Sequence, residues 1–417
     1  MISKQFTLLA ATVAFALPAI GQEWARFRGS DGSAVSRVKT IPAKISVGDI
    51  NWTTDLKGYG HSSPVAWGDR LFLTTSSEKS GGLTVQCLNI KNGGRIWKKD
   101  FALNPFRKHK YNSFASATPV LDEKNLYVGW SEPGKYTFAA ISHGGDLVWQ
   151  RDLGPFVSQH GSGASPTIYD GKIILNSMKD ENSFVIALDK QSGRTIWKNE
   201  RPSMVAAYGS AAVYQPKGGQ AQLLFTSQAD GIYSLDPRSG KQLWQMPGLY
   251  TKRSACSVTI AGDVVWGSCG SGGGGNYVVA VRAGVPEKGI KPSKAWEIRR
   301  SSQSPYVPTP VVMGEYGYLL SDAGFLSCIK HQTGEIVYSE RLNTNGRRGA
   351  NFFSSPVIID GRLYCLTTTG KLYVCKTGPK YEVISAFDFD GTCHATPAVH
   401  KGRLYVRTAE KLFSIGG

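Results

Sequence analysis

The sequence of 417 residues has few long apolar runs, few acidic residues and no adjacent cysteines. Beyond its first two dozen residues, no segment stays apolar for the roughly 18 residues that a membrane-spanning helix needs, so we expect a soluble mature protein. Asp and Glu number 31 against 48 Lys and Arg, which gives a formal net charge of +17. This excess predicts polyanionic surroundings, or else reflects scattered Lys and Arg that aid solubility.

The seven cysteines are all separated from one another, and an odd number leaves at least one unpaired. Cys365 and Cys375 flank one predicted turn, and Cys256 and Cys269 flank another in a similar way. A cross-strand disulfide could form in either pair. The alternative is that these cysteines are small buried side chains with free thiols.

The first residues have the pattern of a secretory signal peptide. Lys4 is followed by an apolar core at 8–17 and by a small-residue cleavage site at 19–21. We therefore expect residues 1–21 to be a signal peptide, residues 22–49 an N-terminal extension, and the destination to be the periplasm or the outside of the cell. No cysteine follows the apolar core, so a lipid anchor is not expected. Export also makes nucleic acid an unexpected partner despite the basic charge.

The segment from Ser165 to Trp197 has the clearest strand pattern. Its four short runs lie at 165–169, 172–175, 184–188 and 194–197. The first two runs are joined by Asp170-Gly171, which favours a tight hairpin because glycine tolerates the positive φ of the turn. A four-stranded meander of about 35 residues is too small to bury its own faces and needs stacked copies of itself.

The copies are present along the whole chain after residue 60. Eight units begin at His61, Ala117, Ser165, Ser210, Ser254, Thr309, Ser354 and Ala395. A tryptophan recurs on the fourth strand or its equivalent, at positions 52, 97, 149, 197, 244 and 296. We expect each of these rings to pack against the neighbouring unit beside small turn residues rather than to bind a ligand.

The eighth unit stops after three strands, whereas residues 51–56 resemble a fourth strand with no partners before them. If this early strand completes the last sheet, the ring closes without a free edge. The sequence therefore predicts an all-β protein, an eight-bladed β-propeller of four-stranded antiparallel blades over residues 50–417, closed by an N-terminal strand.

The repeated pattern S-P-x-x-x-x-G-x-[IL]-[IY] followed by A-L-D-x-x-[ST]-G-[KR]-x-x-W is similar to the PQQ-like (pyrroloquinoline quinone) repeat of eight-bladed propellers. That superfamily includes the quinoprotein alcohol dehydrogenases and the BamB-like outer-membrane assembly factors. The opening W-A-R-F-R-G-S-D-G also resembles exported proteins with this repeat. The resemblance covers nearly all of the chain after residue 50.

Resemblance to a quinoprotein dehydrogenase implies PQQ over the channel, a bound Ca²⁺, a catalytic Asp and often an adjacent Cys-Cys pair. This sequence has no such pair, and the segments before each first strand hold almost no carboxylates, the ligands that Ca²⁺ prefers. We therefore expect no cofactor and no catalytic residue. A PQQ-dependent or degenerate quinoprotein oxidoreductase with Ca²⁺ is the alternative.

The same segments, which converge on one mouth of a propeller channel, are rich in basic, aromatic and amide side chains. The candidate ligand-binding residues are His61, His109, Tyr111, Asn112, His160, Lys252, Arg253, Arg347, Arg348 and His394. Such a mouth suits an anionic ligand or an acidic protein segment, so the sequence predicts a non-catalytic binding or scaffold protein of the cell envelope. A protein that handles sulfated or uronic glycans would use the same mouth.

A zinc site built from His61, His160 and His394 is the remaining alternative at the mouth. These histidines belong to units one, three and eight. We expect a wide eight-bladed channel to hold them too far apart to share one ion. Oligomeric state and the identity of the ligand are not set by the sequence.

Overall fold

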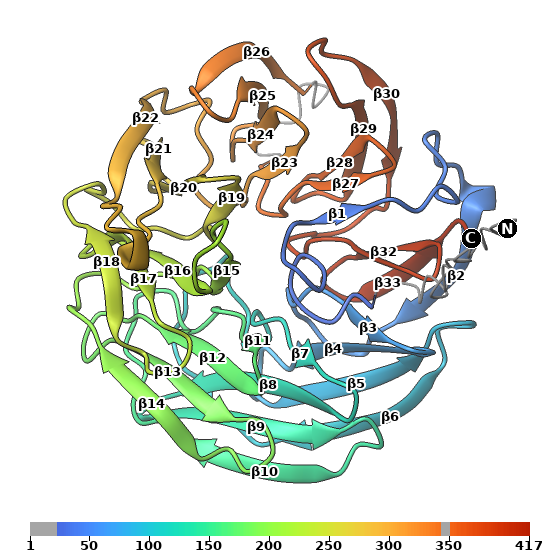
Figure 1. Ribbon diagram of the computed structural model, residues 1–417. Helices are drawn as coiled ribbons and strands as arrows, with labels where there is room; N and C mark the ends of the chain where they lie inside the picture. Colours follow the sequence, from blue (N-terminus) through green and yellow to red (C-terminus); the bar gives the residue numbers. More distant parts are fainter. Residues whose placement is uncertain (1–22, 343–350) are drawn as a thin grey trace, which may run out of the picture.

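The computed structural model describes residues 23–342 and 351–417 and forms eight sheets arranged in a ring (Figure 1). Each sheet is a meander of four antiparallel strands, and one sheet has an additional fifth strand. The predicted all-β, eight-bladed propeller is therefore confirmed. In the described part of the chain, helical structure consists of two 3₁₀ turns, η1 (Val47–Asp49) and η2 (Pro286–Lys288), and no helix has the length and apolar character to cross a bilayer.

The first four blades follow the chain in order. Blade 1 consists of β3 (Val65–Trp67), β4 (Arg70–Ser76), β5 (Leu83–Asn89) and β6 (Arg95–Phe101). Blade 2 consists of β7 (Val120–Leu121), β8 (Asn125–Glu132), β9 (Lys135–Ser142) and β10 (Leu147–Asp152). Blade 3 consists of β11 (Thr167–Tyr169), β12 (Lys172–Ser177), β13 (Phe184–Asp189) and β14 (Thr195–Glu200). Blade 4 consists of β15 (Ala212–Tyr214), β16 (Gln222–Ser227), β17 (Gly231–Leu235) and β18 (Gln242–Met246).

The last four blades complete the ring. Blade 5 consists of β19 (Thr259–Ala261), β20 (Val264–Cys269), β21 (Tyr277–Arg282) and β22 (Ser293–Ile298). Blade 6 consists of β23 (Val311–Met313), β24 (Tyr316–Leu320), β25 (Phe325–Lys330) and β26 (Glu335–Arg341). Blade 7 consists of β27 (Val357–Ile359), β28 (Arg362–Leu366), β29 (Lys371–Lys376), β30 (Val383–Asp388) and the added β1 (Val35–Ser36). Blade 8 consists of β31 (Ala398–His400), β32 (Arg403–Arg407), β33 (Lys411–Ile415) and the early strand β2 (Ile50–Asp55).

The hairpin that defined the repeat has the predicted geometry. Tyr169 pairs with Lys172 across a two-residue turn, and both turn residues have positive φ, +48° for Asp170 and +71° for Gly171. Two successive positive φ values belong to the primed turns whose twist matches that of antiparallel strands. The Asp-Gly sequence therefore determines where β11 reverses into β12.

The N-terminal strand closes the ring as the sequence predicts. Strand β2 pairs antiparallel with β33, with Trp52 opposite Ser414 and Thr53 opposite Phe413. Blade 8 thus has the order β2-β33-β32-β31. Its outer edge is paired by a segment more than 350 residues away in sequence, so an early strand and the last strand of the chain are neighbours in one sheet.

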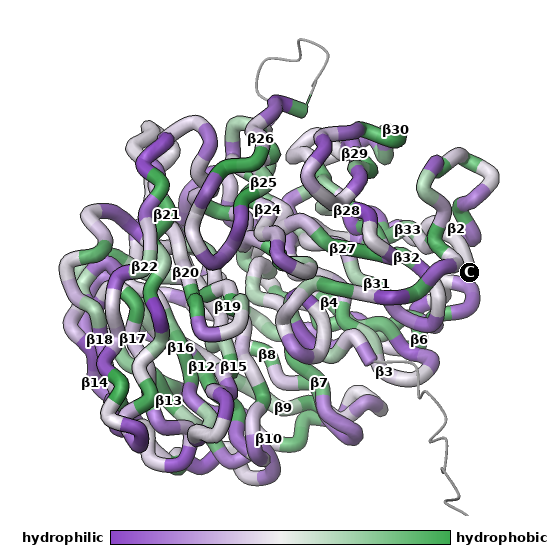
Figure 2. The backbone as a smooth tube through the Cα atoms, turned by 45° about the horizontal axis from the view of Figure 1, so that its top comes forward, coloured by the Kyte–Doolittle hydropathy of each residue, from purple (hydrophilic) through white to green (hydrophobic). Residues whose placement is uncertain are grey.

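The hydrophobic core lies between neighbouring blades. In one cluster, for example, Phe138 of blade 2 packs with Ile173 and Leu188 of blade 3. The hydrophobic colour in Figure 2 follows the strands, and the hydrophilic colour gathers in the connecting loops. All seven cysteines are buried and have free thiols, including the two pairs in which a disulfide could form.

The recurring tryptophans join each outer strand to the next blade. Nε1 of five of them donates to a backbone carbonyl of the following blade, in the pairs Trp52–Ile90, Trp97–His143, Trp149–Lys190, Trp197–Pro237 and Trp296–His331, at 2.8–3.2 Å. Trp244 differs, because its Nε1 donates to Oε1 of Gln222 within its own blade at 2.7 Å. A Cβ at Gly193 would lie 2.7 Å from the Trp149 ring, so the turn needs glycine there. The predicted packing role of these rings is confirmed.

A belt of hydroxyl groups joins the inner strands around the channel. At seven blade junctions a backbone N–H donates to the Ser or Thr hydroxyl of the adjacent blade at 2.9–3.1 Å, and the pairs are Thr396–Ser63, Ser63–Thr118, Thr118–Ser165, Ser210–Ser257, Ser257–Thr309, Thr309–Ser355 and Ser355–Thr396. At the junction of blades 3 and 4, the Thr167 hydroxyl donates to the carbonyl of Ala211 at 3.0 Å. The Ser/Thr of the repeat motif is therefore a structural link between blades.

Residues 23–36 run across the middle of the ring, a position that the sequence does not predict (Figure 1). Trp24 forms a bridge with Ala66 of blade 1, and the carbonyl of Ala25 accepts a hydrogen bond from Leu121 of blade 2 at 2.7 Å. At its other end, β1 pairs in parallel with β27 of blade 7. This segment, here called the channel plug, fills part of the channel and leaves the mouth formed by the fourth-to-first-strand loops as a separate site.

Candidate binding site at the channel mouth

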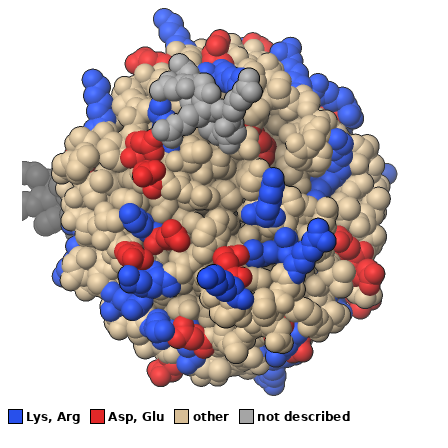
Figure 3. All heavy atoms as spheres, turned by 180° about the vertical axis from the view of Figure 1, so that it is seen from behind, with Lys and Arg blue, Asp and Glu red and all other residues tan. Residues whose placement is uncertain are grey.

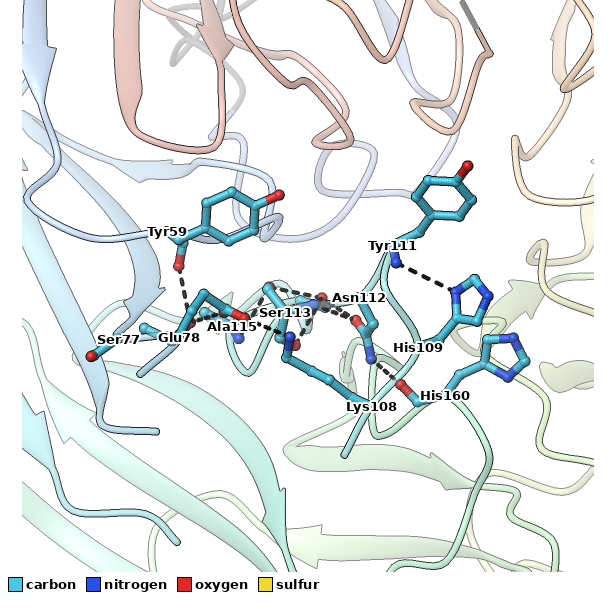
Figure 4. Close-up of polar contacts among 12 residues, drawn as sticks. Tyr59, Ser77, Glu78, Lys108, His109, Tyr111, Asn112, Ser113, Ala115 and His160 are labelled. Atoms are coloured by element: carbon cyan, nitrogen blue, oxygen red, sulfur yellow. Dashed lines mark hydrogen bonds and ion pairs between the residues drawn. The ribbon is translucent and has the colours of Figure 1, made fainter. Parts of the chain in front are cut away.

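The mouth is built by loops that lead from the outer strand of one blade to the inner strand of the next. Residues 102–119, 153–166 and 201–211 are three successive loops of this kind. They are held together by side-chain hydrogen bonds. Nδ2 of Asn112 donates to the carbonyl of His160 at 2.5 Å and to that of Ser162 at 3.3 Å, which ties the first loop to the second (Figure 4).

Aromatic and imidazole rings form a continuous arc across this face. The neighbouring ring centroids are Tyr59–His61 at 5.0 Å, His61–His394 at 4.1 Å, His394–Tyr111 at 6.2 Å, Tyr111–His109 at 5.4 Å, His109–His160 at 4.6 Å and His160–Tyr208 at 6.4 Å. Phe353 adds a ring 5.0 Å from His394 and 5.3 Å from Tyr111. We call this set the ring arc. Six of the ten predicted site residues thus lie in one connected region. Five of them belong to the ring arc, namely His61, His109, Tyr111, His160 and His394, and the sixth is Asn112.

Circular closure explains how distant histidines meet. His61 precedes the first strand of blade 1 and His394 the first strand of blade 8, and their ring centroids lie 4.1 Å apart with the ring planes tilted by 34°. The expectation that the three candidate zinc ligands are too far apart is wrong for this pair, because blades 1 and 8 are neighbours in the closed ring. The ring of His160 instead contacts that of His109, with the ring planes tilted by 37°. Among the described residues, no group of three or more His, Cys, Asp or Glu side chains is placed to hold a metal.

The histidines of the ring arc are neutral at pH 7. Burial, with the nearby His394 and Arg407, lowers the pKa of His61 to about 2. Burial also lowers the pKa of His394 to about 4, and burial together with Arg253 lowers that of His160 to about 4. The pKa of His109 is lowered by burial and by Lys110. A neutral imidazole can stack on a planar group or exchange one hydrogen bond at each nitrogen.

His61 is 8% exposed, and neither of its buried ring nitrogens has a hydrogen-bond partner. His394 is better satisfied, because its Nδ1 lies 3.2 Å from the carbonyl of Tyr111. Since a carbonyl can only accept, Nδ1 of His394 carries the proton and its Nε2 is left as an acceptor.

The predicted basic residues of the mouth that the structure describes have local partners. Nζ of Lys252 donates to the carbonyl of Gly274 at 2.6 Å, and Nε of Arg253 donates to that of Ala206 at 3.1 Å. Arg347 and Arg348 lie outside the described residues. Figure 3 views the molecule from behind Figure 1 and shows Lys and Arg interspersed with Asp and Glu among many uncharged residues.

Exposed apolar side chains lie on each of the three mouth loops, and two of them, Val157 and Met204, are not predicted by the sequence. Tyr111, Val157 and Met204 are 45%, 46% and 53% exposed, and each lies in one of the three successive loops described above. Large apolar side chains exposed on adjacent loops often mark an interaction surface. Sequence alone does not tell an exposed loop residue from a buried one, so Val157 and Met204 give no signal before the structure is known.

The donor groups of the mouth do not match a calcium-bound quinone. Ca²⁺ takes several carboxylate or carbonyl oxygens, whereas the ring arc presents imidazole and phenol groups. Asp322 is near the mouth, but its carboxylate accepts the backbone N–H of Tyr306 at 2.6 Å and that of Val307 at 3.3 Å. Burial raises the pKa of Asp322 to about 6, despite these hydrogen bonds.

The fold and the repeat define a PQQ-like β-propeller. A family model described as outer membrane protein assembly factor BamB matches residues 81–340, well over half of the chain, and the chain belongs to this family. None of the curated proteins matches the sequence.

Solved structures share this fold at low sequence identity. BamB from Moraxella catarrhalis is 16% identical, with a TM-score of 0.61 over 89% of this chain and 96% of its own. A quinohemoprotein alcohol dehydrogenase from Comamonas testosteroni is 13% identical, with a TM-score of 0.65 over 95% of this chain and 80% of its own. Saccharomyces cerevisiae Sqt1 is 10% identical, with a TM-score of 0.58 over 88% of this chain and 99% of its own. Similarity at such low sequence identity shows the fold alone, because one fold serves many functions, and the function of this chain depends on the residues of its mouth.

Proposed function

We propose that this protein is an exported, non-catalytic scaffold that binds an extended segment of a partner protein at the channel mouth. The observation that carries the proposal is the ring arc, in which Tyr111 is exposed, together with Val157 and Met204 exposed on the two following mouth loops. The family description as an assembly factor supports a protein partner. Export rests on the signal-peptide pattern at 1–21, which lies outside the described residues.

The chemistry of the mouth favours a partner segment with aromatic or apolar side chains. Offset or edge-on ring contacts each contribute about 0.5–1.5 kcal/mol beyond the burial of area. The neutral imidazoles allow such stacking without the cost of desolvating a cation.

Acidic residues in the partner would be complementary to the basic side chains near Tyr111. Lys110 places its Nζ 4.9 Å from the centre of the Tyr111 ring, and Arg107 is exposed on the same loop. Such charges increase the rate of association and orient the partner more than they increase affinity. Binding should therefore weaken with salt without being lost.

Site-specific photo-cross-linking tests this proposal in cells that express the protein. A photoreactive phenylalanine analogue at Tyr111, Val157 or Met204 is expected to cross-link to the same partner polypeptide from all three positions. The matched control is Ile96 on the outer strand β6, which is equally exposed at 45% but lies away from these loops.

Two results would contradict the proposal. One is the absence of any cross-linked polypeptide at all three mouth positions. The other is the same product at Ile96 as at Tyr111, which would show that the contact does not depend on the mouth.

A further inference from the structure

A cavity separate from the channel mouth lies between the channel plug and the inner strands of blades 4 to 6. Its volume is about 310 Å³, and its lining includes Arg26 and Arg28 of the plug, Ala212 of β15 and the β19 residues Thr259 and Ile260. It is formed by different residues from those of the ring arc. A cavity of this size holds a small metabolite or a substituted anion rather than one or two waters.

Two buried guanidinium groups give this cavity its charge. Arg26 is 6% exposed and Arg28 is 3% exposed. Burial lowers the pKa of Arg26 to about 10 and that of Arg28 to about 9, so both remain protonated at pH 7. Within the described chain neither forms an ion pair with a carboxylate, although the exposed Asp31 also lines the cavity and acts on both guanidinium groups through space.

The partners of the two arginines differ in a way that indicates their roles. Arg28 uses its nitrogens on carbonyl oxygens, with Nη1 donating to Thr309 and Nη2 to Pro310, both at 2.6 Å. Arg28 therefore fastens the plug to the start of blade 6. These neutral carbonyl dipoles solvate the charge of Arg28 but do not cancel it.

Arg26 keeps donor capacity for a ligand. Its Nε donates to the carbonyl of Ser30 at 3.1 Å, and its Nη1 donates to the hydroxyl of Thr167 at 3.0 Å. No hydrogen bond is found for its Nη2 anywhere in the described residues. A Cβ at Gly32 would lie 2.5 Å from this nitrogen, so only glycine leaves room for the guanidinium in its present position.

We propose that this cavity binds a small oxyanion, a phosphate, sulfate or carboxylate group, through Arg26. The planar guanidinium fork suits an oxyanion, and burial strengthens the attraction because little water screens it. Two arginines and one carboxylate line the cavity, so an anion here would compensate the remaining positive charge and would stabilise the plugged channel, since it binds only when the plug is in place.

Titration of the purified full-length protein with inorganic phosphate at constant ionic strength tests the site. Wild type is expected to show saturable heat of binding and a saturable rise in Tm at millimolar phosphate, where general salt effects are small. Arg26→Gln should weaken binding at least tenfold. Arg37→Gln is the matched control, because it removes the same charge from an exposed residue of the same N-terminal region and should bind as wild type does.

A second variant leaves both arginines in place and fills part of the cavity. Ala212→Leu adds bulk at a partly exposed position of the cavity lining and should also weaken phosphate binding at least tenfold. It decides the question if Arg26→Gln fails to fold. The proposal is overturned if wild type shows no saturable binding, or if Arg26→Gln or Ala212→Leu binds phosphate as wild type does. These outcomes are independent of the cross-linking result at the mouth.

Discussion

At the scale of single residues, the most informative side chain is His61. It is buried against Tyr59 and His394, and neither of its ring nitrogens has a partner. A buried polar group without a hydrogen bond costs roughly 1–3 kcal/mol. The two unpartnered nitrogens therefore lower stability, and His61 lies near one end of the ring arc, between Tyr59 and His394.

The substitution His61→Phe should make the protein more tolerant of acid. The unfolded His61 has an ordinary pKa near 6.5 and the folded one about 2, so below pH 6.5 the unfolded state binds more protons. The stability that depends on a neutral His61 is therefore complete above pH 6.5 and decreases as the pH falls towards 2. Phenylalanine keeps the ring packing and does not titrate.

We expect His61→Phe to be as stable as wild type or more stable at pH 7. At pH 4.5 it should be more stable by about 2–3 kcal/mol, since two pKa units correspond to about 2.7 kcal/mol. Urea unfolding at both pH values measures this difference. Asp322 has a raised pKa and changes stability in the opposite sense in both proteins, so it cancels in the comparison. If the difference in unfolding free energy between His61→Phe and wild type is the same at both pH values, the lowered pKa of His61 in the folded protein is disproved.

At the scale of elements, the strand β2 holds the ring closed. Its Trp52 ring lies 6.0 Å from that of Tyr405 in its own blade and donates Nε1–H to Ile90 of blade 1. The same residue therefore supports both the last sheet and the junction to the first. Loss of this contact should loosen closure of the whole ring rather than one blade alone.

Trp52→Ala should lower the free energy of unfolding by about 2–4 kcal/mol, because a half-buried ring is lost and a gap remains between blades 8 and 1. Thr53→Ala on the same strand is the control. Its side chain is exposed, so its effect should stay within about 0.5 kcal/mol. Urea denaturation of both variants measures the effect. Equal effects would show that Trp52 does not stabilise the closure.

The elements also show what a sequence can reveal. Strand positions and the role of the tryptophans could be predicted because their spacing recurs along the chain, with the tryptophan in six of the eight units. Closure by β2 could be predicted because the last unit has three strands and one strand is left over before the first unit. The path of residues 23–36 could not. The segment occurs once and has no periodicity, and its position depends on Arg26 and Arg28 reaching groups that only the finished ring brings together.

The same limit applies to the candidate site. The histidines of the mouth could be identified because they lie in the segments before the first strands, and these segments form the loops at one end of the channel. The contact between the rings of His61 and His394 depends on closure across more than 300 residues of sequence, and the lowered pKa values depend on burial. The neutral, ring-lined character of the mouth therefore appears only in three dimensions.

At the scale of the whole molecule, the ring has two different openings. The channel plug occupies the middle of the ring and presents buried cations to a cavity, while the loops on the other side present the ring arc. The hydroxyl belt and the tryptophans hold the eight blades in a fixed arrangement between them. A rigid scaffold with a preformed mouth loses little conformational entropy when a partner binds.

The most direct test of the central claim measures the affinity of the cross-linked partner segment for purified protein. The account predicts that the double variant His109→Ala, Tyr111→Ala raises the dissociation constant at least tenfold, whereas Ile96→Ala on the outer strand leaves it unchanged. Equal affinity of the double variant and wild type would contradict the assignment of the ring arc as the binding surface.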